Sequence, residues 1–317
     1  MIGNIPPQRF FYHSFPRRRG PEETYEVEKG LAILRLMKKM GLLLTPENIQ
    51  WPDVSSDGSP SGPWTIVQIR CCFTELGPTE LPQHAEVFGH FAIEFEIQVL
   101  PRLGAIPVFY LPRTPIGGAE ALATEFVACI GNTQILLDRL LELEELVRIN
   151  SNKHKRLVII KNRVTRETRS SVEGAEDLLK SLTEGIQPPA RLNAVLRALS
   201  GYFYPIEDLD YTSLLGYYRQ REWRILGNMK PTRPLKMDER ESLLQLDPEF
   251  FKEKLTFGTG THPRVDQCKV FQELDGKPII GYARRVIVPA VALARAKEIV
   301  NEPSDPPLTD LESMASS

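Results

Sequence analysis

The sequence predicts an α+β protein with a small mixed or antiparallel sheet and a helical insertion. Apolar segments of five to eight residues, rich in Val, Ile, Phe and Tyr, lie before residue 115 and again after residue 200, and such segments are typical of strands. The stretch between them is mostly helix-forming, and no internal repeat suggests a solenoid. We therefore expect residues 1–115 and 201–300 to form two halves of one core, residues 116–200 a mainly helical insertion, and residues 301–317 a disordered tail.

The first half of the core begins with a short strand and a helix. Residues 9–15 alternate as a strand does. Apolar side chains over residues 27–42 recur at helical spacing, and Gly41 closes this helix as a left-handed cap. Residues 52–63, rich in Pro, Ser, Gly and Asp, form a loop. Four more elements are expected in this half: a strand over 65–74, a helical turn around His84, and strands near 91–97 and 105–111.

The insertion and the second half of the core follow. The long run ending in LDRLLELEELVRI, interrupted by Gly131 and Asn132, predicts a helical hairpin over residues 117–149. The other expected elements are a strand over 156–160, helices over 172–184 and 189–199, strands over 217–225 and 279–288, and a helix over 290–300. Three Pro, several acids and few large apolar residues in 301–317 indicate a tail without anchors.

Composition excludes several classes of function. The net charge of −2, from 39 basic and 41 acidic side chains, creates no overall field that would draw the chain onto nucleic acid. No window approaches the roughly 20 apolar residues that cross a bilayer, and the N-terminus lacks the features of a signal peptide. We therefore expect a cytoplasmic protein without membrane contact. The four Cys have no CxxC spacing, so neither a metal site nor a disulfide framework is expected.

Common catalytic motifs are absent from the sequence. It has no P-loop, no GxGxxG that opens a helix after a strand, no HExxH and no GxSxG. ATP-driven, Rossmann-type and triad-hydrolase chemistry therefore have no support.

Polar residues on three predicted strands remain as site candidates. They are Tyr12 and His13 on the first strand, Phe73 beside Arg70 and Thr74 on the second, and Glu222 with Arg224 on a late strand. A core histidine and a solvated ion pair are the alternative interpretations of His13 and of the late charges. Arg70 fits such an interpretation less well, because an unpaired guanidinium inside an apolar strand carries a large desolvation cost. Arg70 therefore needs either solvent on one face of the strand or a carboxylate partner, for which Glu75, Glu94 and Glu222 are the candidates.

The order of these motifs resembles the AbiGi-type abortive phage-resistance proteins. The resemblance covers residues 9–111 and 217–290. It rests on an early His, a Gly41-Leu-Leu-Leu44 after the helix, Arg70-Cys-Cys-Phe-Thr-Glu75, His84, Phe88-Gly-His-Phe-Ala-Ile-Glu-Phe95, Pro107-Val-Phe-Tyr110 and Arg221-Glu-Trp-Arg224. It implies a role in antiviral defence by abortive infection, as one component of a toxin–antitoxin pair.

More distantly, the layout is similar to that of ADP-ribosyltransferases, whose sheet core binds NAD as a substrate. That resemblance implies that Glu222 stabilises the ribose cation, that His13 contacts the adenosine ribose and that Arg70 pairs with the pyrophosphate. Tyr12, Phe73, Thr74 and Arg224 would complete the NAD site, without a metal. The sequence departs from this family in lacking a central Ser-Thr-Ser and an ExE pair, since Arg221-Glu-Trp-Arg224 offers only one acid.

Two functions from different classes therefore stay open. The first is a toxin that cleaves NAD and modifies a nucleic-acid or protein acceptor. The second is a non-catalytic antitoxin or sensor that binds a cognate protein through the helical middle of the chain. Convergence of His13, Arg70 and Glu222 in one place would favour the transferase, because a binding module gives no reason for buried charges to gather.

Overall fold

The computed structural model divides the chain into two compact units. The core unit comprises residues 1–52, 62–114 and 202–317, and the insertion unit comprises residues 53–61 and 115–201. The structure describes residues 8–17, 27–51, 64–112, 119–151, 158–160, 168–170, 189–200, 202–206, 221–227, 232–256 and 260–314. The loop expected over 52–63 and the helix expected over 172–184 lie outside the described residues.

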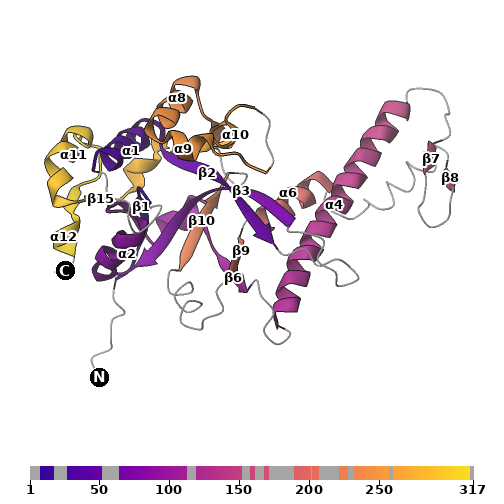
Figure 1. Cartoon of the computed structure of the whole chain (residues 1–317), viewed down its shortest axis with the longest axis horizontal. Helices are drawn as coiled ribbons and strands as arrows, with labels where there is room; N and C mark the ends of the chain where they lie inside the picture. Colours follow the sequence, from indigo (N-terminus) through magenta and orange to yellow (C-terminus); the bar gives the residue numbers. More distant parts are fainter. Residues whose placement is uncertain are drawn as a thin grey trace. The chain divides into compact units, whose positions relative to one another are not determined.

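The core unit is built on a ten-stranded mixed sheet, mostly antiparallel, which confirms the α+β class but is larger than the small sheet predicted (Figure 1). Its strands are β1 (Phe10–Phe15), β2 (Leu42–Trp51), β3 (Trp64–Leu76), β4 (Phe91–Glu96), β5 (Ile106–Pro107), β10 (Glu222–Leu226), β11 (Arg233–Pro234), β12 (Lys269–Phe271), β15 (Arg285–Val288) and β16 (Leu308–Asp310). The main path runs β11-β12-β2-β3-β1-β4-β15-β16, and β10 pairs with β3 and β5. Two-stranded pairs form between β6 (Phe109–Pro112) and β9 (Phe203–Ile206), and between β13 (Glu273–Leu274) and β14 (Lys277–Pro278).

Strand β3 is the branch point of the sheet. Arg70 pairs with Thr45 of β2 and with Leu226 of β10, and Thr74 pairs with Tyr12 of β1 and with Glu222 of β10. Because a strand has only two edges, β2 and β1 share one edge of β3, and β10 occupies the other. The sheet therefore opens into two branches on one side of β3, while β10 runs along its opposite side.

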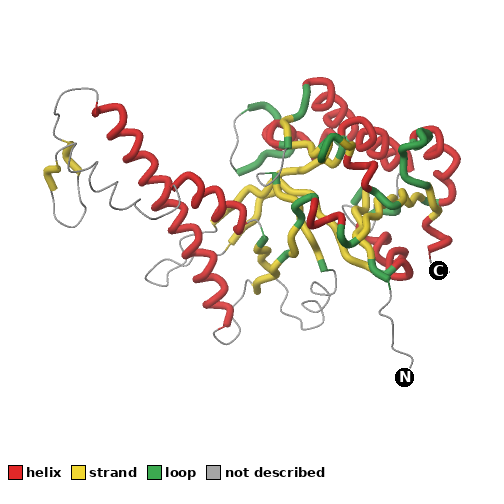
Figure 2. Tube along the Cα trace, turned by 180° about the vertical axis from the view of Figure 1, so that it is seen from behind, coloured by secondary structure: helices red, strands yellow, loops and turns green. Residues whose placement is uncertain are grey.

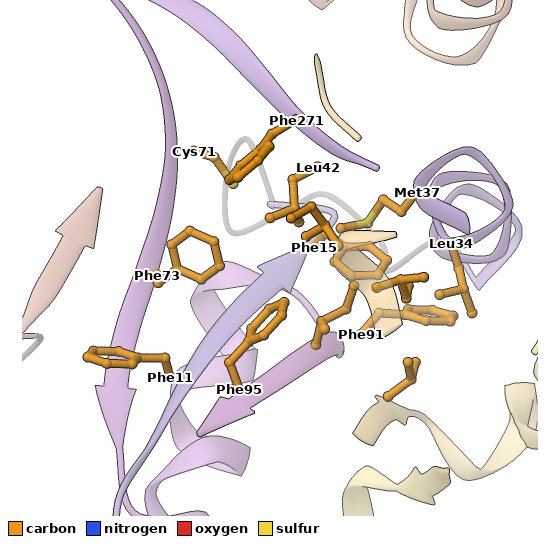
Figure 3. Close-up of a cluster of buried hydrophobic side chains, with 14 of the residues drawn as sticks. Phe11, Phe15, Leu34, Met37, Leu42, Cys71, Phe73, Phe91, Phe95 and Phe271 are labelled. Carbon is orange, nitrogen blue, oxygen red and sulfur yellow. The ribbon is translucent and has the colours of Figure 1, made fainter. Parts of the chain in front are cut away.

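Helices cover both faces of the sheet (Figure 2). On one face α1 (Val27–Met40) and α11 (Leu293–Ile299) pack on the largest hydrophobic cluster, which includes Phe11, Phe73 and Phe95 (Figure 3). On the other face α2 (Leu81–Phe88) and α12 (Leu311–Met314) pack on a smaller cluster around Phe10 and Tyr12. The other helices in the described part of the core unit are η1 (Pro78–Glu80), α3 (Val99–Arg102), α8 (Met237–Leu246), α9 (Pro248–Lys252), α10 (Pro263–Gln267), η2 (Ile279–Tyr282) and η3 (Ala290–Ala292).

Helix α1 ends where its sequence predicts, and a strand that was not predicted follows at once. Gly41 has φ +90°, and its N–H donates to the Met37 carbonyl oxygen at 2.9 Å, as in a left-handed cap. The chain then enters β2. The strand was not predicted because it contains Pro46, and proline is rare inside a sheet. In the structure Pro46 lies opposite Ile69 of β3.

The structure of the C-terminal residues differs more strongly from the prediction. Residues 301–317 were predicted to be a disordered tail, yet β16 adds a parallel strand to β15, and Leu311 and Met314 of α12 are buried. The prediction is therefore wrong for residues 301–314. The strand predicted over 279–288 is shorter, because η2 occupies Ile279–Tyr282 before β15 begins at Arg285.

The insertion unit contains one long helix where a hairpin was predicted. Helix α4 (Ala119–Ser151) continues through Gly131 and Asn132. A single glycine inside a helix costs only about 1 kcal/mol relative to alanine, which does not suffice to break it. Helix α6 (Pro189–Ser200) packs on α4, with Asn193 Nδ2 donating to Asp138 Oδ1 at 2.5 Å, and β7 (Val158–Ile160) pairs with β8 (Thr168–Ser170). Within the described parts of both units, no helix is long and apolar enough to cross a membrane.

Candidate functional site

Strand β3 separates polar from apolar side chains by simple alternation. Successive side chains of a strand point to opposite faces of the sheet. Cys71 and Phe73 belong to the large hydrophobic cluster under α1, so Gln68, Arg70, Cys72 and Thr74 point to the opposite face. We call these four residues, with Glu222 and Arg224 of β10, the polar face.

Strand β10 brings its two charged residues onto the same face. Glu222 lies opposite Thr74 and Arg224 lies opposite Cys72. The N–H of Glu75 donates to the Arg221 carbonyl oxygen at 3.3 Å, which makes Thr74 and Glu222 a non-hydrogen-bonded pair of the antiparallel ladder. In such pairs the Cβ atoms lie about 4.5–5.5 Å apart. Thr74 and Glu222 are therefore close neighbours on the polar face.

Two donors fix the carboxylate of Glu222. Arg224 Nε donates to Oε1 at 2.7 Å, and the Tyr110 hydroxyl donates to Oε2. The Arg224 side chain is 1% exposed, whereas that of Glu222 is 15% exposed. Burial acts to raise the pKa of Glu222, but the charge and hydrogen bond of Arg224, the charge of Arg70 and the Tyr110 hydroxyl together lower it to about 2. Glu222 is therefore ionised throughout the physiological range.

The two arginines of the polar face share one acceptor. Arg70 Nη1 and Arg224 Nη1 both donate to Gln68 Oε1, at 3.2 and 3.3 Å. Arg70 also forms an ion pair with Glu47 of β2. Each arginine of the polar face therefore has its own carboxylate partner, Glu47 for Arg70 and Glu222 for Arg224. These ion pairs offset the desolvation of the two buried guanidinium groups.

The carboxylate that pairs with Arg70 is not among the three predicted. Glu75 binds Arg9 Nε at 3.0 Å and Arg221 Nη1 at 2.8 Å. Glu94, which is fully buried, binds Arg284 and Arg285 at 2.7 and 2.9 Å. The charge of Arg70 lowers the pKa of Glu222, but the ion pair of Glu222 is with Arg224. Among the described residues, the carboxylate that forms an ion pair with Arg70 is that of Glu47, on the strand β2 that was not predicted.

A hydrogen-bonded histidine borders Thr74. His84 of α2 has its Nε2 atom 3.2 Å from Thr74 Oγ1 and its Nδ1 atom 3.5 Å from Ser14 Oγ. Its ring stacks on Phe88, with centroids 4.3 Å apart and planes inclined by 17°. Burial lowers the pKa of His84 to about 4, so the imidazole is neutral at pH 7.

His13 does not join this group. Its ring packs beside Phe73 and Phe15, with centroids 5.5 and 6.1 Å away, on the apolar side of the sheet. Its Nδ1 atom lies 2.8 Å from the Cys72 carbonyl oxygen. Because a carbonyl oxygen only accepts, Nδ1 carries the proton. Burial lowers the pKa of His13. The His13 imidazole therefore has a structural role: it donates a hydrogen bond to the Cys72 carbonyl oxygen of β3, at the point where the sheet branches.

The seven predicted site residues are therefore divided by the sheet. Arg70, Thr74, Glu222 and Arg224 lie on the polar face, whereas His13 and Phe73 lie on the other. Tyr12 shares the transverse row of Thr74 and Glu222, but its hydroxyl is buried. Burial and the charge of Glu94 raise its pKa.

Three residues of the site, Gln68, Tyr110 and Glu47, were not predicted from the sequence. The first could have been found, because Gln68, Arg70, Cys72 and Thr74 occupy every second position of one strand. The other two come from β6 and β2, and only the tertiary fold brings them to β3. Over the described ranges, no group of three or more His, Cys, Asp or Glu side chains could hold a metal ion.

The cysteines provide a first test of this arrangement. All four are free, and Cys129 of the insertion unit is exposed. Burial and the Glu222 charge raise the pKa of Cys72 to about 12, against the lowering effect of Arg70 and Arg224. At pH 8 its thiolate fraction is then about 10⁻⁴, and only the thiolate reacts. We expect a thiol reagent to modify Cys129 rapidly in the native protein and the other three only after unfolding. Rapid native labelling of Cys72, located by mass spectrometry, would contradict the arrangement.

Comparisons with known proteins identified no relative of this chain. No protein-family model, no curated protein and no solved structure matches the chain. The polar face must therefore be interpreted from its own chemistry.

Proposed function

We propose that the core unit is a transferase of the ADP-ribosyltransferase type, which cleaves NAD and acts in phage defence by abortive infection. The observation that carries the proposal is the carboxylate of Glu222. It is ionised, oriented by Arg224 and Tyr110, and set beside a hydroxyl group on a polar face. A fixed anion of this kind suits a reaction in which positive charge develops.

The chemistry of NAD cleavage matches this carboxylate. The bond between the ribose carbon and the nicotinamide nitrogen breaks through an oxocarbenium-like state, and its electron pair leaves with nicotinamide. A preorganised anion beside the ribose stabilises that state more than it stabilises NAD itself. The proposal assigns this role to Glu222.

The neighbouring side chains support binding of the rest of the substrate. Arginine guanidinium groups bind phosphate oxygens through paired donors, and Arg70 and Arg224 lie within hydrogen-bonding distance of one shared oxygen. We assign the pyrophosphate to these arginines and the ribose hydroxyls to Thr74. His13 and Phe73 have no part in the proposal, because their side chains lie on the other side of the sheet.

The experiment that tests the proposal measures turnover directly. The purified chain is incubated with NAD labelled in the adenine moiety, with and without cell extract, and nicotinamide release and label transfer are followed. We expect nicotinamide release, and transfer to a protein or nucleic acid if the extract supplies the acceptor. A folded chain that releases no nicotinamide in any extract would reject the transferase.

A second function is favoured by a separate observation. Leu136 of α4 is 60% exposed, and Val195 and Leu199 of α6 are 47% and 43% exposed. Exposed apolar side chains on helices suit a protein partner. A non-catalytic antitoxin or sensor that binds a cognate protein through the insertion unit would need no NAD turnover. Loss of the cellular phenotype on substituting Leu136 with glutamate, in a chain inert to NAD, would favour it.

A further inference from the structure

His84 has the placement of a group that handles protons. Both ring nitrogens face hydroxyl groups, Ser14 Oγ on β1 and Thr74 Oγ1 on β3. Stacking on Phe88 fixes the plane of the ring. The side chains of His84, Ser14 and Thr74 are only partly buried. The imidazole is therefore oriented between two hydroxyl groups, and one of these belongs to Thr74, the neighbour of Glu222 in the ladder.

The protonation state of the ring makes it an acceptor. A neutral imidazole has one N–H donor and one bare nitrogen, so it donates to one hydroxyl and accepts from the other. Burial alone accounts for the lowered pKa of His84. Two charged groups of its own helix and of the preceding segment are engaged elsewhere: Glu86 lies 3.6 Å from His90, and Glu80 pairs with Arg9 at 3.1 Å. The guanidinium of Arg17 lies over the Phe88 ring, 5.4 Å from its centroid.

Glu222 itself is poorly suited to accept a proton. Its pKa is about 2, and both of its oxygens already accept hydrogen bonds. A base that must remove a proton near neutral pH works better when its pKa is closer to that pH. Thr74 connects the two groups, because it is the direct neighbour of Glu222 in the ladder and the hydrogen-bond partner of His84.

We propose that His84, acting through the hydroxyl of Thr74, accepts the proton of the nucleophile that attacks the ribose carbon beside Glu222. The inference rests on the function proposed above. A water molecule forms a bond from its oxygen to the ribose carbon while the carbon–nicotinamide bond breaks. The electron pair of that bond leaves with nicotinamide. The water proton passes to Thr74 Oγ1 as the proton of Thr74 passes to His84 Nε2, and Ser14 holds the other ring nitrogen.

The test uses His84→Gln, because a glutamine amide retains one donor and one acceptor but accepts no proton near neutral pH. We expect kcat for NAD hydrolysis to fall by about 10²–10⁴-fold, the usual contribution of general acid–base catalysis. KM for NAD should change by less than about threefold, since the variant keeps the groups that bind the substrate. Gln83→Ala, an exposed position on the same helix, is the matched control and should keep wild-type kinetics.

Azide separates proton transfer from a structural effect. Azide is an anionic nucleophile without a proton, so its attack on the ribose carbon needs no base. We expect azide to restore nicotinamide release in His84→Gln, with formation of the azide adduct of ADP-ribose. It should have little effect on the wild type.

The outcomes distinguish this inference from the function on which it rests. A wild type that consumes no NAD overturns both. An active wild type with His84→Gln within about threefold of its kcat overturns only the role of His84. A slow His84→Gln variant that azide does not rescue shows that the residue acts by supporting the fold, and this result also rejects the inference.

Discussion

The Glu222→Gln substitution is expected to lower the rate of nicotinamide release by about 10²–10³-fold, the range measured when one preorganised electrostatic contact to a transition state is removed. The amide has nearly the shape of the carboxylate but no charge to oppose the ribose cation. It also removes the anion of the ion pair between Glu222 and Arg224, whose side chain is 1% exposed. We therefore expect a loss of about 3–5 kcal/mol in the free energy of unfolding, the usual effect of breaking a buried ion pair.

Because Glu222→Gln is expected to lower both the rate and the stability, it needs a control variant that loses stability but not activity. Glu239 of α8 is 3% exposed, receives two hydrogen bonds from Arg233 at 2.7 and 2.8 Å, and lies outside the polar face. Glu239→Gln should be destabilised in urea unfolding yet retain the wild-type kcat at a temperature where it is folded. If the two variants lose activity in proportion to their loss of stability, Glu222 is a structural residue and the proposed chemistry fails.

Part of the polar face could be predicted from the sequence, because the alternation of residues within a single strand determines which side chains share a face. The alternation over residues 65–74 predicts a strand, and the same alternation places Arg70 and Thr74 on one face. It also forbids two of the predicted combinations. Tyr12 and His13 are adjacent on one strand, as are Phe73 and Thr74, so the members of each pair must point to opposite faces. A stricter use of the period of two would have removed His13 and Phe73 from the site.

The rest depended on contacts between distant segments. Tyr110 and Glu222 are 112 positions apart in the chain, and Glu47 and Arg70 are 23 apart across a strand with an internal proline. Strand register decides these contacts, and no local pattern of residues encodes it. His84 was visible in the sequence, but its hydroxyl partners on β1 and β3 were not.

Removing residues 301–317 is expected to destabilise the core unit strongly, although their composition predicts a disordered tail. Strand β16 extends the sheet beside Val286 and Val288. Lys38 of α1 donates to Asp305 Oδ2 at 2.8 Å. Leu311 and Met314 are 8% and 1% exposed. Burial of two large apolar side chains contributes about 1.5–3 kcal/mol each. We expect the truncated chain to lose at least about 3 kcal/mol of unfolding free energy in urea.

Point variants show whether the loss comes from packing. Met314→Ala should cost about 2–5 kcal/mol, as for other buried methionines, whereas Ser304→Ala, at an exposed position, should be neutral. Because Met314 packs in the same cluster as Leu81 and Ala85 of α2, the variant also loosens the helix that carries His84. Faster amide hydrogen exchange in α2 would report this effect. An unfolding midpoint unchanged by the truncation would mean that residues 301–314 contribute nothing to stability, and the support of His84 would then have to come from β1 and β3 alone.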